Sequence, residues 1–174
     1  MAANGAFDAF GSPAFTGASS EDRSWLTAAV EMSRLSPPTS TNYAVGAIIV
    51  DRRGSVLATG YTGEIGPRDH AEEAALAKLS VRPGIDLSQA TIYSSLEPCT
   101  ARKSRPGTCT DLILAAGIGR VVLALREPLL FADCHGVESL REGGVEVIEI
   151  TDLAYLVREI NAHVLDLRPA RTQI

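Results

Sequence analysis

The chain has 174 residues, of which 45% are hydrophobic and 21% are charged, and its formal net charge is −5. A chain of this size buries roughly 70% of the surface that its unfolded form would expose, and this composition excludes a disordered protein. The acidic balance argues against nucleic acid as the partner, and no apolar run is long enough to span a membrane.

The cysteine content points to a reducing environment. Three cysteines are an odd number, whereas disulfide scaffolds normally carry an even one. We therefore expect a cytoplasmic location, where thiols stay free to bind metal. The N-terminal region lacks a basic segment followed by an apolar one, so no secretory signal is predicted.

The region 1–19 is rich in Ala, Gly and Ser and has neither a helical nor a strand period. It predicts a flexible N-terminal arm, followed by a single domain over 20–174. A helix is expected to open that domain, because Ser19 and Asp22 match a capping box, and to end at Pro37. The helical period predicts a core face made of Trp25, Ala28, Met32 and Leu35.

Strands and helices then alternate along the chain. Short apolar runs bounded by turn residues predict strands at 45–50, 55–60, 90–94, 120–125 and 145–150. Helical patterns occur at 70–80, 110–116, 137–142 and from a Thr151 cap to about Leu165. The first two strands form a hairpin, and the later ones are joined by helical crossovers. This order predicts an α/β fold, a three-layer α/β/α sandwich around a mixed five-stranded sheet.

Candidate metal ligands lie at the junctions between these elements. His70 opens a predicted helix, Cys99 follows a predicted strand, and Cys109 precedes the next helix. Zinc prefers imidazole nitrogen and thiolate sulfur, and three protein ligands leave the fourth position for water, as in catalytic sites. Helix N-termini also lower thiol pKa values. The alternative is a buried histidine with two structural thiols and no metal.

Two segments carry a family resemblance. Residues 70–76 read His-Ala-Glu-Glu-Ala-Ala-Leu, and residues 95–99 read Ser-Leu-Glu-Pro-Cys. They match the H-x-E and P-C parts of the zinc deaminase signature, so the chain resembles the cytidine deaminase-like superfamily. Nine residues separate Cys99 from Cys109, whereas most of the superfamily has two. This long loop resembles the deaminase domain of the bifunctional riboflavin-biosynthesis deaminase/reductase, over about 42–165.

The resemblance implies roles for individual residues. His70, Cys99 and Cys109 would bind Zn²⁺, and Glu72 would be the catalytic proton shuttle. Glu73 is predicted to be a solvent-exposed charge on the same helix. Contacts with the substrate are expected from Asn42, Thr62 and Ala71.

The loop between the two cysteines carries Arg102, Lys103 and Arg105. Three basic residues tied to the metal ligands suggest a receptor for a substrate phosphate, with a solvated loop as the alternative. Cys134 and His135 are expected to be ordinary loop residues, with a contact behind the metal ligands or a wall of the substrate site as the alternatives.

The expected function is zinc-dependent hydrolytic deamination of a small-molecule aminopyrimidine. The riboflavin-pathway phosphoribosylaminopyrimidine, or a related compound, is the expected substrate. One alternative is a deaminase of cytidine, deoxycytidylate, a nucleobase or a specialised metabolite. Another is a non-catalytic zinc-fold protein that binds a nucleotide or a partner. The resemblance also implies a homodimer or homotetramer.

Overall fold

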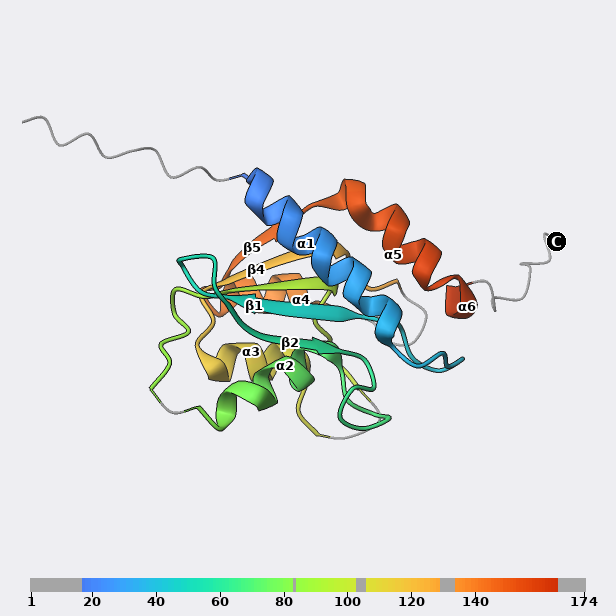
Figure 1. The fold of residues 1–174 in the computed structure, drawn as a ribbon, viewed down its shortest axis with the longest axis horizontal. Helices are drawn as coiled ribbons and strands as arrows, with labels where there is room; N and C mark the ends of the chain where they lie inside the picture. The colour runs from blue at the N-terminus through green and yellow to red at the C-terminus, as the bar shows by residue number, and fades with distance from the viewer. Residues whose placement is uncertain (1–16, 83, 103–105, 129–133, 166–174) are drawn as a thin grey trace, which may run out of the picture.

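The computed structural model describes residues 17–82, 84–102, 106–128 and 134–165 (Figure 1). Its strands are β1 (Gly46–Val50), β2 (Val56–Tyr61), β3 (Thr91–Leu96), β4 (Arg120–Leu125) and β5 (Glu146–Glu149). They form one five-stranded sheet in the order β2-β1-β3-β4-β5. β1 is antiparallel to both of its neighbours, whereas β3, β4 and β5 run parallel. The predicted mixed sheet is confirmed.

Helices cover both faces of the sheet (Figure 1). They are α1 (Ser20–Met32), α2 (Ala71–Ser80), α3 (Cys109–Ala116), α4 (Gly136–Glu142), α5 (Ala154–Ile160) and α6 (Ala162–Leu165), with 3-10 turns η1 (Ser33–Leu35) and η2 (Thr151–Leu153). α1 and α5 lie on one face, and α2, α3 and α4 lie on the other. The structure is therefore the predicted three-layer sandwich. None of the described helices is long and apolar enough to cross a membrane.

Local capping signals explain where several helices begin and end. The Ser19 hydroxyl accepts a hydrogen bond from the Asp22 backbone, and the Asp22 carboxylate accepts one from the Ser19 backbone. The left-handed backbone of Gly117 (φ 72°) ends α3. The predicted cap at Thr151 is wrong, because the chain forms the turn η2 there, with no side-chain cap.

The buried face of α1 differs from the one that the helical period predicts. Leu26, Ala29 and Val30 are fully buried, whereas Leu35 is 62% exposed. The reason is a close approach to β1, since a Cβ at Gly46 would lie only 2.1 Å from the Ala29 carbonyl oxygen. The contact between Gly46 and Ala29 therefore turns the face with Leu26, Ala29 and Val30 toward the sheet. Trp25 is only partly buried and packs at the border of the core.

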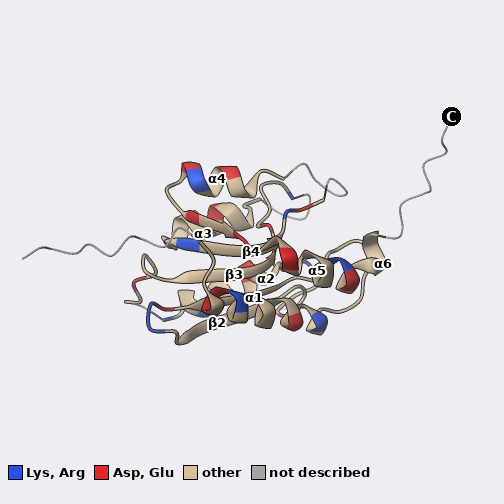
Figure 2. Ribbon diagram, turned by 90° about the horizontal axis from the view of Figure 1, so that it is seen from above, with Lys and Arg blue, Asp and Glu red and all other residues tan. Residues whose placement is uncertain are grey.

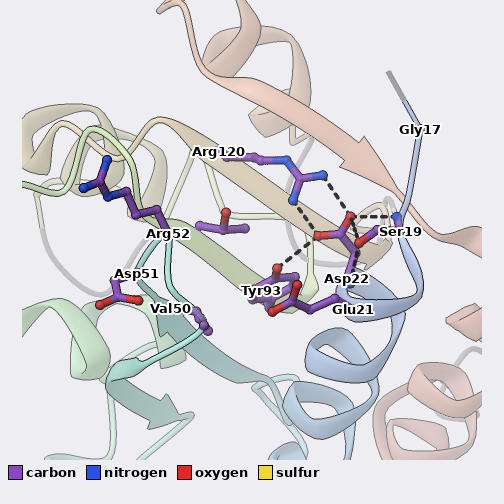
Figure 3. A pocket seen from close by; sticks show the side chains of 11 residues that line it. Gly17, Ser19, Glu21, Asp22, Val50, Asp51, Arg52, Tyr93 and Arg120 are labelled. Carbon is purple, nitrogen blue, oxygen red and sulfur yellow. Dashed lines mark hydrogen bonds and ion pairs between the residues drawn. The ribbon is translucent and has the colours of Figure 1, made fainter. Parts of the chain in front are cut away.

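A buried ion pair ties α1 to the sheet (Figure 3). Asp22 is 4% exposed, and Arg120, at the start of β4, donates to it through Nη1 and Nη2 at 2.5 and 3.0 Å. The Tyr93 hydroxyl of β3 donates to the same carboxylate at 3.0 Å. These groups line a hollow of about 270 Å³ at the end of the sheet where β3 and β4 begin. The polar atoms of the three side chains bind one another, so the cluster holds α1 in place.

The opposite edge of α1 carries an exposed ion pair of the same type. Arg23 bonds to Asp152, and the two side chains are 50% and 57% exposed. Figure 2 shows Lys and Arg next to Asp and Glu on the helices of this face. Exposed ion pairs of this kind contribute little to stability.

We expect Asp22→Asn to lower the free energy of unfolding by roughly 2–3 kcal/mol at pH 7, because Arg120 loses a buried charged partner. The matched control Asp152→Asn removes the exposed pair and should cost less than about 1 kcal/mol. Chemical denaturation of both variants measures the difference, and equal losses would contradict this account.

The same pair predicts a pH dependence. Burial alone would raise the pKa of Asp22, but hydrogen bonds from Arg120 and Ser19 outweigh it and hold the pKa well below the ordinary value. A folded-state pKa below the unfolded one gives stability that is present above about pH 4 and is lost as the pH falls. The stability gap between wild type and Asp22→Asn should therefore shrink when unfolding is measured from pH 5 down to about pH 2.

Candidate active site

The three predicted metal ligands meet at one end of the sheet. His70 immediately precedes α2, Cys99 lies just beyond β3, and Cys109 is the first residue of α3. Their donor atoms all lie within 4.8 Å of one another. α2 can reach this position because it packs directly on β2, where a Cβ at Gly60 would lie 2.2 Å from the Ala71 carbonyl oxygen.

The distances between the donor atoms fit a tetrahedral zinc ion. Nδ1 of His70 lies 3.5 Å from Sγ of Cys99 and 3.4 Å from Sγ of Cys109. Zn–N and Zn–S bonds of about 2.0 and 2.3 Å at a tetrahedral angle require an N···S distance of about 3.5 Å. Within the described residues, these three side chains are the group that could hold a metal ion, which leaves a fourth position for a small ligand.

The two thiols are prepared for metal before it binds. The Cys109 backbone N–H donates to Sγ of Cys99 at 3.4 Å. Hydrogen bonds from Cys109 and His70 lower the pKa of Cys99 in spite of its burial. The hydrogen bond to Cys99 and burial raise the pKa of Cys109. The thiolate form, which is the form that binds metal, is therefore favoured at Cys99.

Glu72 lies in the first turn of α2 and is 3% exposed. Burial raises its pKa above the ordinary value of a glutamate. The Ser94 hydroxyl lies 2.7 Å from Glu72 Oε1 and 2.8 Å from the Leu96 carbonyl oxygen. A hydroxyl has one hydrogen, so it can donate to the ionised Glu72 or accept from the protonated one while donating to Leu96. Both protonation states thus find a partner, as a proton-transferring group requires.

The prediction that Glu73 is a solvent-exposed charge is wrong. Its side chain is 18% exposed and forms a 3.1 Å ion pair with Arg102, whose side chain is only 4% exposed. Arg102 also donates to the Arg68 carbonyl oxygen at 2.8 Å, and Glu73 accepts from the His70 backbone at 3.4 Å. The pair therefore links the loop after Cys99 to the start of α2.

This geometry bears on the predicted phosphate receptor. The Arg102 guanidinium is paired with Glu73, and its side chain is 4% exposed. Lys103 and Arg105 lie outside the described residues.

The predicted substrate contacts lie on three segments near the metal ligands. The Asn42 amide donates to the Pro67 carbonyl oxygen at 3.5 Å, across the loop that leads to His70. Thr62 is buried, and its hydroxyl accepts from the Val45 backbone at 3.1 Å. Ala71 is fully buried at the first position of α2.

Cys134 and His135 contact the residue that follows Cys99. The Thr100 backbone donates to Sγ of Cys134 at 3.3 Å, and the His135 backbone donates to the Thr100 hydroxyl at 3.0 Å. Burial raises the pKa of Cys134 to about 12, so this thiol is neutral at physiological pH. The two residues therefore contact both neighbours of Cys99, since Sγ of Cys134 also donates to the Pro98 carbonyl oxygen at 3.5 Å.

Two glutamates near the site carry roles that the sequence did not reveal. Glu97 is 4% exposed, and its carboxylate accepts from the backbones of Glu127 at 3.0 Å and Val137 at 2.9 Å. Burial raises the pKa of Glu127 to about 7. For Glu97, the only signal in the sequence is an acidic residue between an apolar strand and Pro98. This signal does not reveal which backbone N–H groups the carboxylate will bind.

The sequence matches a known family of proteins. A family model described as the cytidine and deoxycytidylate deaminase zinc-binding region matches residues 19–125. The diaminohydroxyphosphoribosylamino-pyrimidine deaminase of Schizosaccharomyces pombe is 38% identical over 126 residues, which are 72% of this chain and 31% of that protein. The riboflavin biosynthesis protein RibD of Aquifex aeolicus is 40% identical over 109 residues, 63% of this chain and 29% of that protein. The chain thus spans less than a third of the length of these relatives.

Solved structures agree with the fold. The Thermotoga maritima diaminohydroxyphosphoribosylaminopyrimidine deaminase/reductase has a TM-score of 0.68 at 32% identity, over 86% of this chain and 42% of that one. The Rib2 deaminase of Aspergillus oryzae, solved in complex with DARIPP, has a TM-score of 0.73 over 83% of this chain and 92% of that one. Its identity is 23%, so it supports the fold alone.

We expect Arg102→Ala to weaken Zn²⁺ binding by about 10- to 100-fold, because Glu73 and the start of α2 lose the partner that orients His70. Competition with a chromogenic chelator measures the affinity. The matched control is Arg68→Ala, which removes an exposed guanidinium but keeps the carbonyl oxygen that Arg102 binds. Equal zinc retention in both variants would show that the ion pair has no part in holding the metal site.

Proposed function

The chain belongs to the cytidine and deoxycytidylate deaminase zinc-binding family, and on this premise we propose that it hydrolytically deaminates an aminopyrimidine. The observation that carries the proposal is the convergence of one imidazole and two thiols beside the buried carboxyl group of Glu72. This donor set is that of the catalytic zinc sites in the deaminases, in which a glutamate that is not a ligand moves the protons.

The proposed substrate is the phosphoribosylated diaminopyrimidine of riboflavin synthesis. It is supported by the names of the relatives in Schizosaccharomyces pombe and Thermotoga maritima and by the long loop between Cys99 and Cys109. We assign its phosphate to the three basic residues of that loop, Arg102, Lys103 and Arg105, of which Arg102 is also paired with Glu73. Asn42, Thr62 and Ala71 are the proposed residues of the substrate pocket.

The site residues divide the reaction between them. His70, Cys99 and Cys109 hold Zn²⁺, which when bound acts as a Lewis acid and lowers the pKa of water to about 7. The carboxylate of Glu72 takes a proton from the attacking water and passes it to the ring nitrogen beside the amine-bearing carbon. Glu72 then takes the remaining proton of the added hydroxyl group and delivers it to the amine. The bond between the ring carbon and the amine nitrogen breaks as the C=O bond forms, so water and substrate become a carbonyl product and ammonia. The Ser94 hydroxyl holds Oε1 of Glu72 during both transfers.

The setting of the enzyme follows from the same site. A dithiol that binds metal must stay reduced, which supports a cytoplasmic location. We also propose a homodimer or homotetramer and a single domain over 20–174, on the family resemblance.

A second candidate function is deamination of cytidine, deoxycytidylate, a nucleobase or a specialised metabolite. The sequence favours it because Thr62 and the segment Thr100-Ala101-Arg102 stand where the riboflavin family usually has histidines. A deoxycytidylate deaminase from cyanophage S-TIM5 has a TM-score of 0.57 at 26% identity, over 74% of this chain. Ammonia release from the riboflavin intermediate, cytidine, deoxycytidylate, cytosine and guanine decides between the two candidates.

We expect Glu72→Gln to keep stoichiometric zinc and to lower kcat by about 10²- to 10⁴-fold, the range for loss of a general acid–base group. Metal analysis and ammonia release from the preferred substrate measure the two quantities. Glu138→Gln, at an exposed position of α4, is the control and should retain full activity. A wild-type chain that binds zinc yet releases no ammonia from any of the five compounds would instead support the non-catalytic alternative.

A further inference from the structure

Three consecutive residues that lead into β1 are each bound by a side chain from a different part of the fold. The Ala44 backbone donates to Asn161 Oδ1 at 2.7 Å. The Val45 backbone donates to the Thr62 hydroxyl at 3.1 Å, and the Gly46 backbone donates to the Ser95 hydroxyl at 3.1 Å. This segment begins two residues after Asn42, with only Tyr43 between them, so its position constrains the position of Asn42.

Asn161 makes the most extensive of these contacts. It is 1% exposed and lies between α5 and α6, 117 residues from Ala44 along the chain. Its Nδ2 donates to the carbonyl oxygens of Ala44 and Val157, each at 3.0 Å. The side-chain amide thus bonds to both the N–H and the C=O of one residue, as a neighbouring strand would.

At Ala44 a side chain takes the place of a neighbouring strand, whereas the Val45 carbonyl oxygen still accepts a hydrogen bond from the Thr62 backbone at 3.0 Å. Pairing of β1 with β2 begins at Gly46, which lies opposite Tyr61, so the backbone of Ala44 precedes the ladder. Ala44 is nevertheless buried, and a buried peptide group without a hydrogen-bond partner is unfavourable. Asn161 supplies both partners, and it thereby fixes Ala44 to the C-terminal helices.

We propose that Asn161 is a positioning residue for substrate binding, which acts by holding the segment that presents Asn42 beside the loop before His70. The proposal rests on the proposed function, because it requires Asn42 to contact the substrate. It assigns the C-terminal helices a role in affinity for the pyrimidine, with no contact of their own to the reacting atoms. The metal ligands lie on other elements, so the role is separate from zinc binding.

The test compares Asn161→Leu with Val157→Ala in the zinc-loaded full chain. The first variant removes the amide at similar volume, and the second shortens a buried side chain of the same helix while keeping the carbonyl that Asn161 binds. For Asn161→Leu we expect faster hydrogen exchange at the Ala44 amide and a KM about tenfold higher, the size expected for one lost hydrogen bond. We expect kcat within about twofold and zinc content unchanged, since no group at the reacting atoms is altered.

Val157→Ala should change neither Ala44 exchange nor KM at a temperature where both variants are folded. Asn42→Ala should raise KM as Asn161→Leu does, and the double variant should add little, because both changes act through one contact. If Asn161→Leu does not fold, Asn161→Gln displaces the same amide by one methylene and should give the same pattern.

Unchanged exchange and unchanged KM in a folded Asn161 variant would overturn the proposal, as would a rise in KM that adds fully to that of Asn42→Ala. A loss of zinc together with kcat would overturn it too, because it would indicate a general structural defect. A wild-type chain inactive on all the pyrimidines would refute the proposed function and, with it, the substrate role of Asn161. Hydrogen exchange at the Ala44 amide would then still show whether Asn161 holds Ala44 in place.

Discussion

The site depends on how closely α2 approaches the sheet. Gly60 of β2 pairs with Ala47 of β1, and the backbone of α2 lies directly on it. A Cβ at this position would lie 2.2 Å from one backbone atom of the helix and 2.6 Å from another. Any side chain there would move α2 outward and carry His70 and Glu72 away from the two thiols, which belong to other elements. One missing methyl group therefore sets the distances on which metal binding depends.

Buried polar side chains then hold the segments that the sheet does not. Glu97 accepts from two backbone N–H groups, Asn161 serves both polar groups of Ala44, and Asp22 joins α1 to the strands. Each lies at 4% exposure or less. Buried polar groups of this kind are tolerated only when their hydrogen bonds are satisfied. Each of these three side chains is bonded to the backbone or side-chain groups that it holds. The loops around the metal ligands are consequently fixed by specific side chains rather than by apolar packing alone.

Local signals in the sequence were sufficient for much of the fold. The run at Arg120–Leu125 and the capping pair Ser19 and Asp22 depend on neighbours in the chain, and both occur as predicted. The order of His70, Cys99 and Cys109 among the elements also anticipates their meeting. The ion pair of Glu73 with Arg102 and the buried face of α1 could not be foreseen. The first joins residues 29 positions apart, and the second is decided by a glycine on another element.

The carboxylate of Glu97 fixes the two ends of one loop through backbone hydrogen bonds alone. Both ends of the stretch from Glu127 to Val137 are attached to a single carboxylate beside Cys99, through backbone groups that every non-proline residue provides. Substitutions at Cys134 or His135 therefore leave the two attachment points unchanged, because Glu97 binds the backbone at Glu127 and Val137. The composition of this loop can vary in evolution while its two ends keep their places beside Cys99.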